Sequence, residues 1–388
     1  MKGLMIGIGA AGNKAAMAVI NDQSVQIQTE DVVLINSTSK DIPKEFEGQT
    51  VILSDDDSGC GKERAVAKEY IFSAIQSGKL DLDKKAEDYD IVIVVASLEG
   101  GTGSGSAPIV AKYADEMLGK NTHIFGFTGF EDDPRGLQNT VEFFQEISSS
   151  VTVHMIQNKQ FLRAAGNNKF KAEQLANKEL ALRIKLLDGT LLKASSQNID
   201  STDIYKVVNT TGYTTVEYAE LTQDLVDTTD FDKICKKMIY DSKSLRTSKG
   251  QSRMAVIMNI SPASEDAVDT QFKAFKENYG NPYECFVHSM YEPDMPEFIA
   301  VICSGMKLPL DEVKAIYDRY LKESEEVNKE EDSFYDQVHD FKANASNKMF
   351  NMGRPGSKGK SNKNDFLSQF QTKPSGKKKP NPEAENKE

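Results

Sequence analysis

Short segments made almost entirely of apolar residues alternate with amphipathic segments of helical period through the first half of the sequence. The clearest apolar segments are Leu4–Ile8, Val32–Ile35, Ile91–Ala96 and Ile124–Thr128. Strands that are apolar on both faces are typical of a parallel sheet with helices on either side. The pattern therefore predicts an α/β fold built on a Rossmann-like parallel sheet.

Two glycine-rich turns each follow a predicted strand and precede a predicted helix. The first is Gly7-Ile-Gly9-Ala-Ala-Gly12, and the second is Gly100-Gly-Thr-Gly-Ser-Gly105, with Pro108 expected in the first turn of its helix. Glycine lets the backbone approach a phosphate closely, and the N-terminus of the following helix offers free N–H groups. Two such turns on neighbouring strands predict a polyphosphate ligand held from two sides. The residues expected to contact it are Gly9, Ala10, Ala11, Gly12, Asn13, Gly100, Gly101, Thr102, Gly103, Ser104 and Gly105.

Two common nucleotide-binding motifs fit less well. A nicotinamide-binding domain needs an acidic residue at the end of the second strand, where this sequence has Asn36. A Walker A loop needs Ser or Thr after its lysine, but Lys62 is followed by Glu63, and Asp56 stands where that motif has glycine.

The order of these motifs resembles the tubulin/FtsZ superfamily over about residues 3–320. The shared pattern is GxGxxGN at residues 7–13, a strand that ends in Asn36-Ser-Thr, the loop at residues 59–64, and then GGTGSG. The resemblance implies a GTPase domain that hydrolyses GTP on polymerisation, with Mg²⁺ held mainly by the phosphates and no protein side chain assigned to the metal. It adds Gly61 and Lys62 to the phosphate contacts, and Arg64 as a further candidate. For the base and ribose it implies Asn36, Glu131, Asn158 and Asn177, with Arg135 as a further candidate.

Glu99 departs from the family pattern, which has a small residue before the glycine run. A carboxylate beside phosphates would be repelled. We therefore expect the Glu99 side chain to point away from the site, or the loop to bend differently.

The segment Asn198-Ile-Asp200-Ser-Thr-Asp203 opens a predicted helix. By itself it can be interpreted as an N-cap with an acid in the first turn. It is also similar to the catalytic loop of FtsZ-type proteins, which makes Asn198, Asp200 and Asp203 the predicted catalytic residues. Two acids three positions apart can face the same water. The resemblance implies that they act on GTP held by the next subunit of a head-to-tail filament.

The predicted organisation has five parts. They are a GTP-binding domain (1–168), a long central helix (169–194), a smaller second α/β domain for activation (195–306), a C-terminal helical extension (307–350) and a disordered basic tail (351–388).

Charge and cysteine content suggest partners and a compartment. The 388 residues carry a formal net charge of −12, yet residues 351–388 hold nine basic and four acidic residues. The acidic body argues against coating of DNA by the globular part. Four cysteines without a paired pattern fit a reducing bacterial cytoplasm, and no apolar run is long enough to cross a membrane.

The tail favours one subtype of the family. A basic tail after a C-terminal helix is similar to the plasmid- and phage-encoded TubZ type, which implies movement of plasmid or phage DNA. Lys377, Lys378 and Lys379 are then expected to contact a DNA-bound adaptor protein or DNA. The alternatives are an FtsZ-like division or phage-positioning filament and, in a different class, a nucleotide-binding metabolic enzyme.

Overall fold

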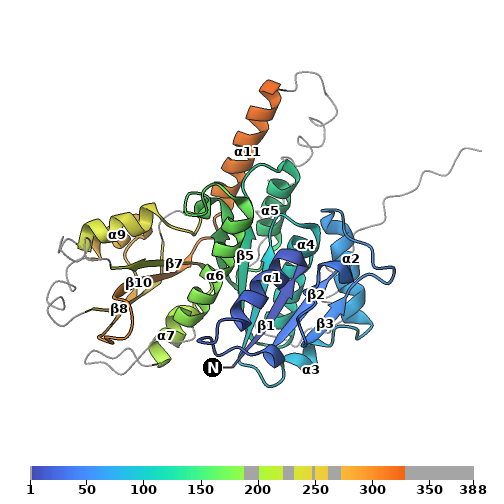
Figure 1. Cartoon of the computed structure of the whole chain (residues 1–388), viewed down its shortest axis with the longest axis horizontal. Helices are drawn as coiled ribbons and strands as arrows, with labels where there is room; N and C mark the ends of the chain where they lie inside the picture. Colours follow the sequence, from blue (N-terminus) through green and yellow to red (C-terminus); the bar gives the residue numbers. More distant parts are fainter. Residues whose placement is uncertain (1, 188–200, 222–230, 247–249, 261–271, 328–388) are drawn as a thin grey trace, which may run out of the picture.

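The computed structural model describes residues 2–187, 201–221, 231–246, 250–260 and 272–327. Within these ranges the strands form one ten-stranded sheet in the order β3-β2-β1-β4-β5-β6-β7-β10-β8-β9. Figure 1 shows the sheet running through the molecule, with helices on both sides. The predicted α/β architecture is confirmed.

The first six strands are all parallel. They are β1 (Gly3–Ile8), β2 (Val32–Asn36), β3 (Gln49–Ile52), β4 (Ile91–Ser97), β5 (Asn121–Thr128) and β6 (Thr152–Gln157). Every residue of β2 and β6 is buried, as expected for strands covered on both faces. The apolar segments of the sequence therefore predicted this half of the sheet correctly.

The helices of the first half cover the two faces of this sheet. They are α1 (Gly9–Ile20), α2 (Arg64–Gln76), α3 (Leu82–Ala86), α4 (Gly101–Lys112) and α5 (Pro134–Glu146). Short 3₁₀ helices lie at Thr29–Asp31, Ser39–Asp41 and Asn158–Phe161, and a π-helical segment follows α4 at Tyr113–Met117. Ile71, Ile109 and Val141 bring α2, α4 and α5 into the core on one face, which includes Ile6. Ala15 of α1 belongs to the core on the other face.

The second half contains α6 (Lys169–Leu187), α7 (Ser201–Val208), β7 (Gly212–Glu220), α9 (Phe231–Tyr240), β8 (Arg253–Asn259), α10 (Lys273–Tyr279), β9 (Glu284–Met290), β10 (Phe298–Met306) and α11 (Leu310–Val327). β10 pairs antiparallel with both β7 and β8. β7 also pairs with β6, so the strands of the second half extend the sheet of the first. The sequence pattern predicted neither β7 nor the short helices α3 and α10.

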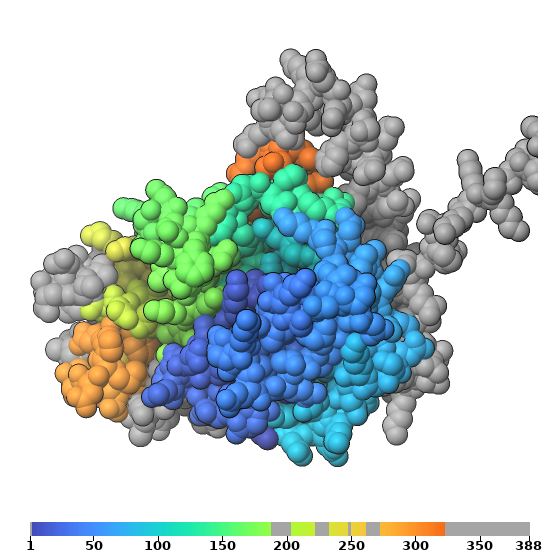
Figure 2. Space-filling model, turned by 45° about the vertical axis from the view of Figure 1, so that its right-hand side comes forward, coloured from blue at the N-terminus to red at the C-terminus, as the bar shows by residue number. Residues whose placement is uncertain are grey.

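The long helix α6 lies between the two halves. In Figure 2 it appears in green beside the dark blue N-terminal segment. Leu180 and Ile184 of this helix are buried in the apolar core on the same face of the sheet as α1. Arg183 is also fully buried. Its charge is accommodated there by an ion pair with Glu179 (2.9 Å) and a hydrogen bond to the carbonyl of Met155 (2.9 Å). The predicted end of this helix, residues 188–194, lies outside the described residues.

At the C-terminal end of the described chain, α11 packs beside α5 and projects from the body (Figure 1). The predicted tail lies outside the described residues. None of the described helices has the length and apolar character needed to cross a membrane.

Candidate nucleotide-binding site

The two glycine-rich turns meet at one point, beyond the C-terminal ends of the interior strands β1 and β4. β1 and β4 are adjacent and parallel, and the strand order reverses between them. The helix after β1 (α1) covers one face, and the helix after β4 (α4) covers the other. In open α/β sheets a ligand binds in the crevice at such a reversal, beyond the C-terminal ends of the strands.

Both helices present free N-termini to this crevice. The N-cap residues, Ile8 for α1 and Gly100 for α4, make no side-chain capping bond, and neither first turn contains an acid. The unpaired N–H groups and the helix dipoles therefore favour an anion. α4 begins inside the glycine run, so the expectation for Pro108 is wrong. This proline is the eighth residue of the helix rather than part of its first turn.

The glycines are required by close packing. A Cβ on Gly12 would collide with the carbonyl oxygen of Val95, and a Cβ on Gly103 would lie 2.6 Å from the carbonyl oxygen of Ser97. Gly9 has a φ of 76°, and a Cβ there would lie 3.3 Å from the amide nitrogen of Gly103. The first turns of α1 and α4 are thus in contact with each other and with the end of β4.

Polar side chains from β2 and α1 surround this contact. Asn13 is buried and donates from Nδ2 to the carbonyl of Ile35 (3.3 Å). Asn36 is also buried, and its Oδ1 accepts from the amide of Ser37 (2.9 Å). The hydroxyls of Ser37 and Thr102 lie 3.1 Å apart. The structure therefore brings the predicted residues of β2, α1 and α4 together at one edge.

The predicted base contacts lie on two different elements, one after β6 and one within α6. Asn158 follows β6, and its buried Oδ1 has no hydrogen-bond partner among the described residues. Asn177 lines a hollow of about 720 Å³ between α1 and α6, with Ala18, Ala165 and Gln174. Asn158 is not part of the lining of that hollow.

Glu131 and Arg135 are engaged with protein partners. The Glu131 carboxylate pairs with Lys159 (2.6 Å) and with Arg319 of α11 (3.1 Å). Arg135 pairs with Glu63 (2.7 Å). A ribose contact by either side chain would have to compete with these ion pairs.

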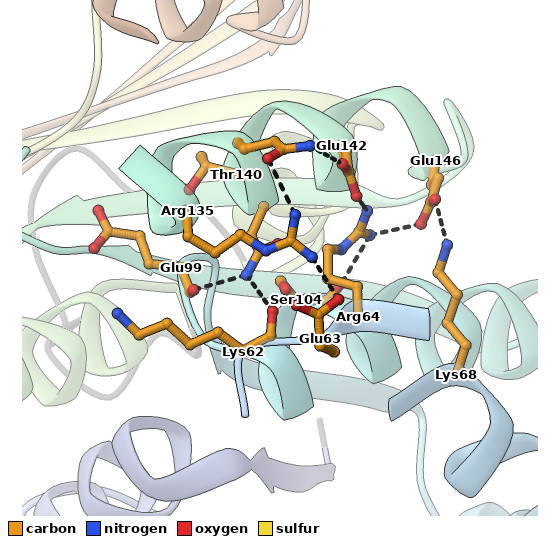
Figure 3. A network of polar contacts seen from close by, with 12 residues as sticks. Lys62, Glu63, Arg64, Lys68, Glu99, Ser104, Arg135, Thr140, Glu142 and Glu146 are labelled. Atoms are coloured by element: carbon orange, nitrogen blue, oxygen red, sulfur yellow. Dashed lines mark hydrogen bonds and ion pairs between the residues drawn. The ribbon is translucent and has the colours of Figure 1, made fainter. Parts of the chain in front are cut away.

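Figure 3 shows a polar network beside the second glycine-rich turn. Arg64 is 2% exposed, and its guanidinium pairs with Glu142 (3.0 Å) and Glu146 (2.6 Å) of α5 and donates to the carbonyl of Ser104 (3.0 Å). These partners hold Arg64 within the protein, which corrects its assignment as a phosphate contact. Lys62, with a φ of 64°, is half exposed and pairs with Asp133.

Glu99 turns away from the glycine run, as we expected from charge repulsion. Its Oε1 accepts a hydrogen bond from the amide of Gly129 (2.6 Å). Burial raises the pKa of Glu99 to about 7, although the bond from Gly129 opposes this shift, and Asp133 and Asp132 raise the pKa further.

Asp203, the one predicted catalytic residue within the described ranges, lies near the N-terminal ends of the parallel strands. Asp203 is on α7, where it pairs with Lys206 (3.1 Å). The hydroxyl of Tyr205, also on α7, accepts from Nδ2 of Asn121 (2.6 Å), the first residue of β5. Because the glycine turns follow the last residues of parallel strands, α7 and these turns flank opposite ends of the sheet. Asn198 and Asp200 lie outside the described residues.

No group of three or more metal-binding side chains occurs in the part of the chain that the structure describes. Asn139 of α5 is a residue of this region that the sequence analysis missed. It is buried and donates to the carbonyls of Lys62 and Glu99 (both 3.0 Å). A polar residue on the sheet-facing side of a predicted helix is the signal that could have indicated it.

Comparisons with known proteins agree with this geometry. Residues 2–166 match the model of the Tubulin/FtsZ family, GTPase domain. The cell division protein FtsZ of Mycoplasmopsis pulmonis is 24% identical over 213 residues, which cover 54% of this chain and 53% of that protein. The chain therefore matches about half the length of this relative.

Solved structures extend the likeness to most of the chain. CetZ2 of Haloferax volcanii, in a GTPγS-bound protofilament, matches with a TM-score of 0.68 and 19% identity, covering 84% of this chain and 99% of that one. TubZ of Clostridium botulinum phage c-st matches with a TM-score of 0.62 and 17% identity, covering 83% and 98%. Residues 2–166 therefore resemble the GTPase domain of the tubulin/FtsZ family, and the described chain has the fold of these solved structures.

Proposed function

We propose that the protein binds GTP at the crevice between α1 and α4, hydrolyses it, and assembles head to tail into filaments. The observation that carries this proposal is the meeting of two uncapped helix N-termini at the strand-order reversal. The phosphates bind there, at the first turns of α1 and α4 and at the loop containing Gly61 and Lys62. Mg²⁺ is held mainly by the phosphates.

Recognition of guanine is supported by Asn158. Its buried Oδ1 is an acceptor without a donor in the described structure. Guanine carries N–H donors on the edge where adenine has an acceptor, so this oxygen favours GTP over ATP. Asn177 and Asn36 complete the base and ribose contacts, together with Glu131 once it leaves its ion pairs.

Hydrolysis is assigned to Asn198, Asp200 and Asp203 of the neighbouring subunit. The described position of Asp203, across the sheet from the glycine turns, supports a site divided between two subunits. In a head-to-tail contact the two acids polarise a water against the γ-phosphate. Repetition of such a contact generates a filament rather than a closed dimer.

Light scattering and sedimentation with GTP, GDP and ATP test this proposal, together with phosphate release at several protein concentrations. Scattering should rise with GTP only, and turnover per subunit should rise steeply above an assembly threshold. Asp200→Ala should bind GTP and assemble, but hydrolyse it about 10²–10⁴-fold more slowly. A flat turnover per subunit would contradict the divided site. Nucleotide turnover without assembly would favour the metabolic enzyme.

We further propose the TubZ type of function, segregation of plasmid or phage DNA in a bacterial cytoplasm. An acidic body with a basic tail supports it, because such a tail attracts an acidic or DNA-bound partner. Deletion of residues 351–388 should spare assembly and remove salt-sensitive binding to DNA or to a DNA-bound adaptor that contacts Lys377, Lys378 and Lys379. A tail that binds neither would favour the alternative division or phage-positioning filament.

A further inference from the structure

Three loops meet around the proposed phosphate site, and they come from distant parts of the sequence. They are residues 59–63 after β3, 98–100 after β4 and 129–133 after β5. Their mutual position sets where the N–H groups of α4 point. A Cβ on Gly101 would lie 2.8 Å from the amide nitrogen of Glu63, so the first residue of α4 rests directly on the first loop.

Asn139 joins two of these loops through one side chain. Its Nδ2 donates to the carbonyl of Lys62 and to the carbonyl of Glu99, both at 3.0 Å. Both partners are carbonyl oxygens, which only accept hydrogen bonds, so the NH₂ group and not Oδ1 must face them. This fixes the orientation of the side-chain amide. Figure 3 shows these two bonds reaching the chain at Lys62 and Glu99.

Asn139 is an unfavourable residue for packing alone. It is fully buried, and its Oδ1 has no partner among the described residues. A buried acceptor without a donor destabilises a fold, whereas an apolar side chain at this place would leave no such atom. The two bonds to the loops are the contribution that offsets this defect.

Glu99 joins the third loop to the second. Its carboxylate accepts from the amide of Gly129 (2.6 Å). A Cβ on Gly136 would lie 2.8 Å from the Cβ of Glu99, and a Cβ on Gly129 would collide with the Glu99 carboxylate. The glycines at 129 and 136 therefore leave room for this side chain. Two further ion pairs reach the first loop: Lys62 pairs with Asp133 of the third loop, and Glu63 pairs with Arg135 of α5. Both pairs are more exposed and contribute less.

We propose that Asn139 and Glu99 are positioning residues that hold the three loops, and with them the N–H groups of α4, in the geometry that binds the phosphates. This proposal rests on the proposed function. Neither side chain touches the nucleotide; both act through the backbone. Donors fixed in advance bind a ligand more tightly than donors that must be ordered on binding.

The test measures the affinity of the full-length protein for a fluorescent GTP analogue and for GDP, below the assembly threshold, alongside thermal unfolding. Asn139→Asp places a carboxylate against two carbonyls. Loss of two ordinary hydrogen bonds corresponds to about tenfold to hundredfold weaker binding. The matched control is Asn259→Asp, because Asn259 is equally buried and donates to the carbonyls of Glu292, Met295 and Pro296 in the second half of the molecule.

A second pair of variants is independent of the first. Glu99→Ala removes the acceptor for Gly129 and should weaken binding about tenfold, whereas Glu99→Gln keeps an acceptor and should stay within about twofold of wild type. If Asn139→Asp fails to fold, this pair decides. A merely structural role would lower the unfolding temperature of Asn139→Asp and Asn259→Asp alike and leave both affinities unchanged, which would overturn the proposal. A wild-type protein that binds no GTP would instead overturn the proposed function itself.

Discussion

Gly103→Ala is a change of one methyl group at the point where the two helix N-termini meet. The new Cβ would lie 2.6 Å from the carbonyl oxygen of Ser97, 3.2 Å from its amide nitrogen and 3.3 Å from the carbonyl oxygen of Ile8. All three are backbone atoms at the ends of strands, so no side chain can rotate to make room. α4 must therefore move away from the sheet by several tenths of an ångström.

Such overpacking costs about 1–3 kcal/mol of unfolding free energy. The displaced N–H groups also lose their alignment with the phosphates, so we expect GTP binding to weaken at least about tenfold. Thermal unfolding and titration with a fluorescent GTP analogue measure the two effects separately.

Gly59→Ala is the matched control. Its Cβ meets no atom within 4 Å, and Gly59 does not have a positive φ. It should bind GTP as wild type does and should be no less stable. If Gly103→Ala loses stability but keeps its GTP affinity, the phosphates do not lie at this turn and the proposed site is wrong.

Two further predictions concern buried charges. Burial raises the pKa of Glu99 to about 7, so the folded protein holds this proton more tightly than the unfolded chain, whose glutamate has a pKa of 4.5. The Glu99 contribution to stability should therefore fall as the pH rises from about 4.5 to 7 and stay constant above that. Between pH 5 and 8, the unfolding free energy of Glu99→Gln in urea should rise by up to about 3 kcal/mol relative to that of wild type. If the unfolding free energies of the two proteins depend on pH in the same way, Glu99 does not carry a buried charge. Arg64→Met leaves Glu142 and Glu146 without their buried partner and should lower the unfolding free energy by about 2–4 kcal/mol in the same assay. The control is Lys68→Met, which should lower it by less than about 1 kcal/mol because the ion pair of Lys68 with Glu146 is more exposed. Equal effects of the two substitutions would show that burial of Arg64 adds nothing to its ion pairs.

The sequence predicted elements whose cause is local. β1 and β4 are apolar runs, and the glycine turns after them have a chemistry that is readable from a few neighbouring residues. β7 was missed because Thr214, Thr215 and Glu217 interrupt any apolar pattern, although all three are buried. Glu217 is accommodated there by hydrogen bonds from Ser242 (2.8 Å) and Tyr279 (3.0 Å), which are distant in sequence.

The same distinction applies within the site. The position of the glycine turns between a strand and a helix could be predicted, because glycines after an apolar run suffice to indicate it. The roles of Arg64 and Asn139 could not, since their partners are far away in the chain. Arg64 is 78 residues from Glu142, and Asn139 is 77 residues from Lys62. A local pattern contains no information about such pairs, so a charge next to a phosphate loop was interpreted as a ligand contact.

The placement of the two half-sites limits how the proposed reaction can proceed. The glycine turns follow the ends of β1 and β4, whereas Asp203 stands on α7 beside the start of β5. α6 connects the two edges with 19 residues, about 28 Å of helix, and its buried core contacts hold it against the sheet. A hydrogen-bonded sheet cannot bring the two ends of its strands together, so in a single subunit Asp203 cannot reach a phosphate at the glycine turns. On the proposed mechanism, hydrolysis therefore requires a second copy of the chain. The contact that builds the filament is then also the contact that starts GTP hydrolysis.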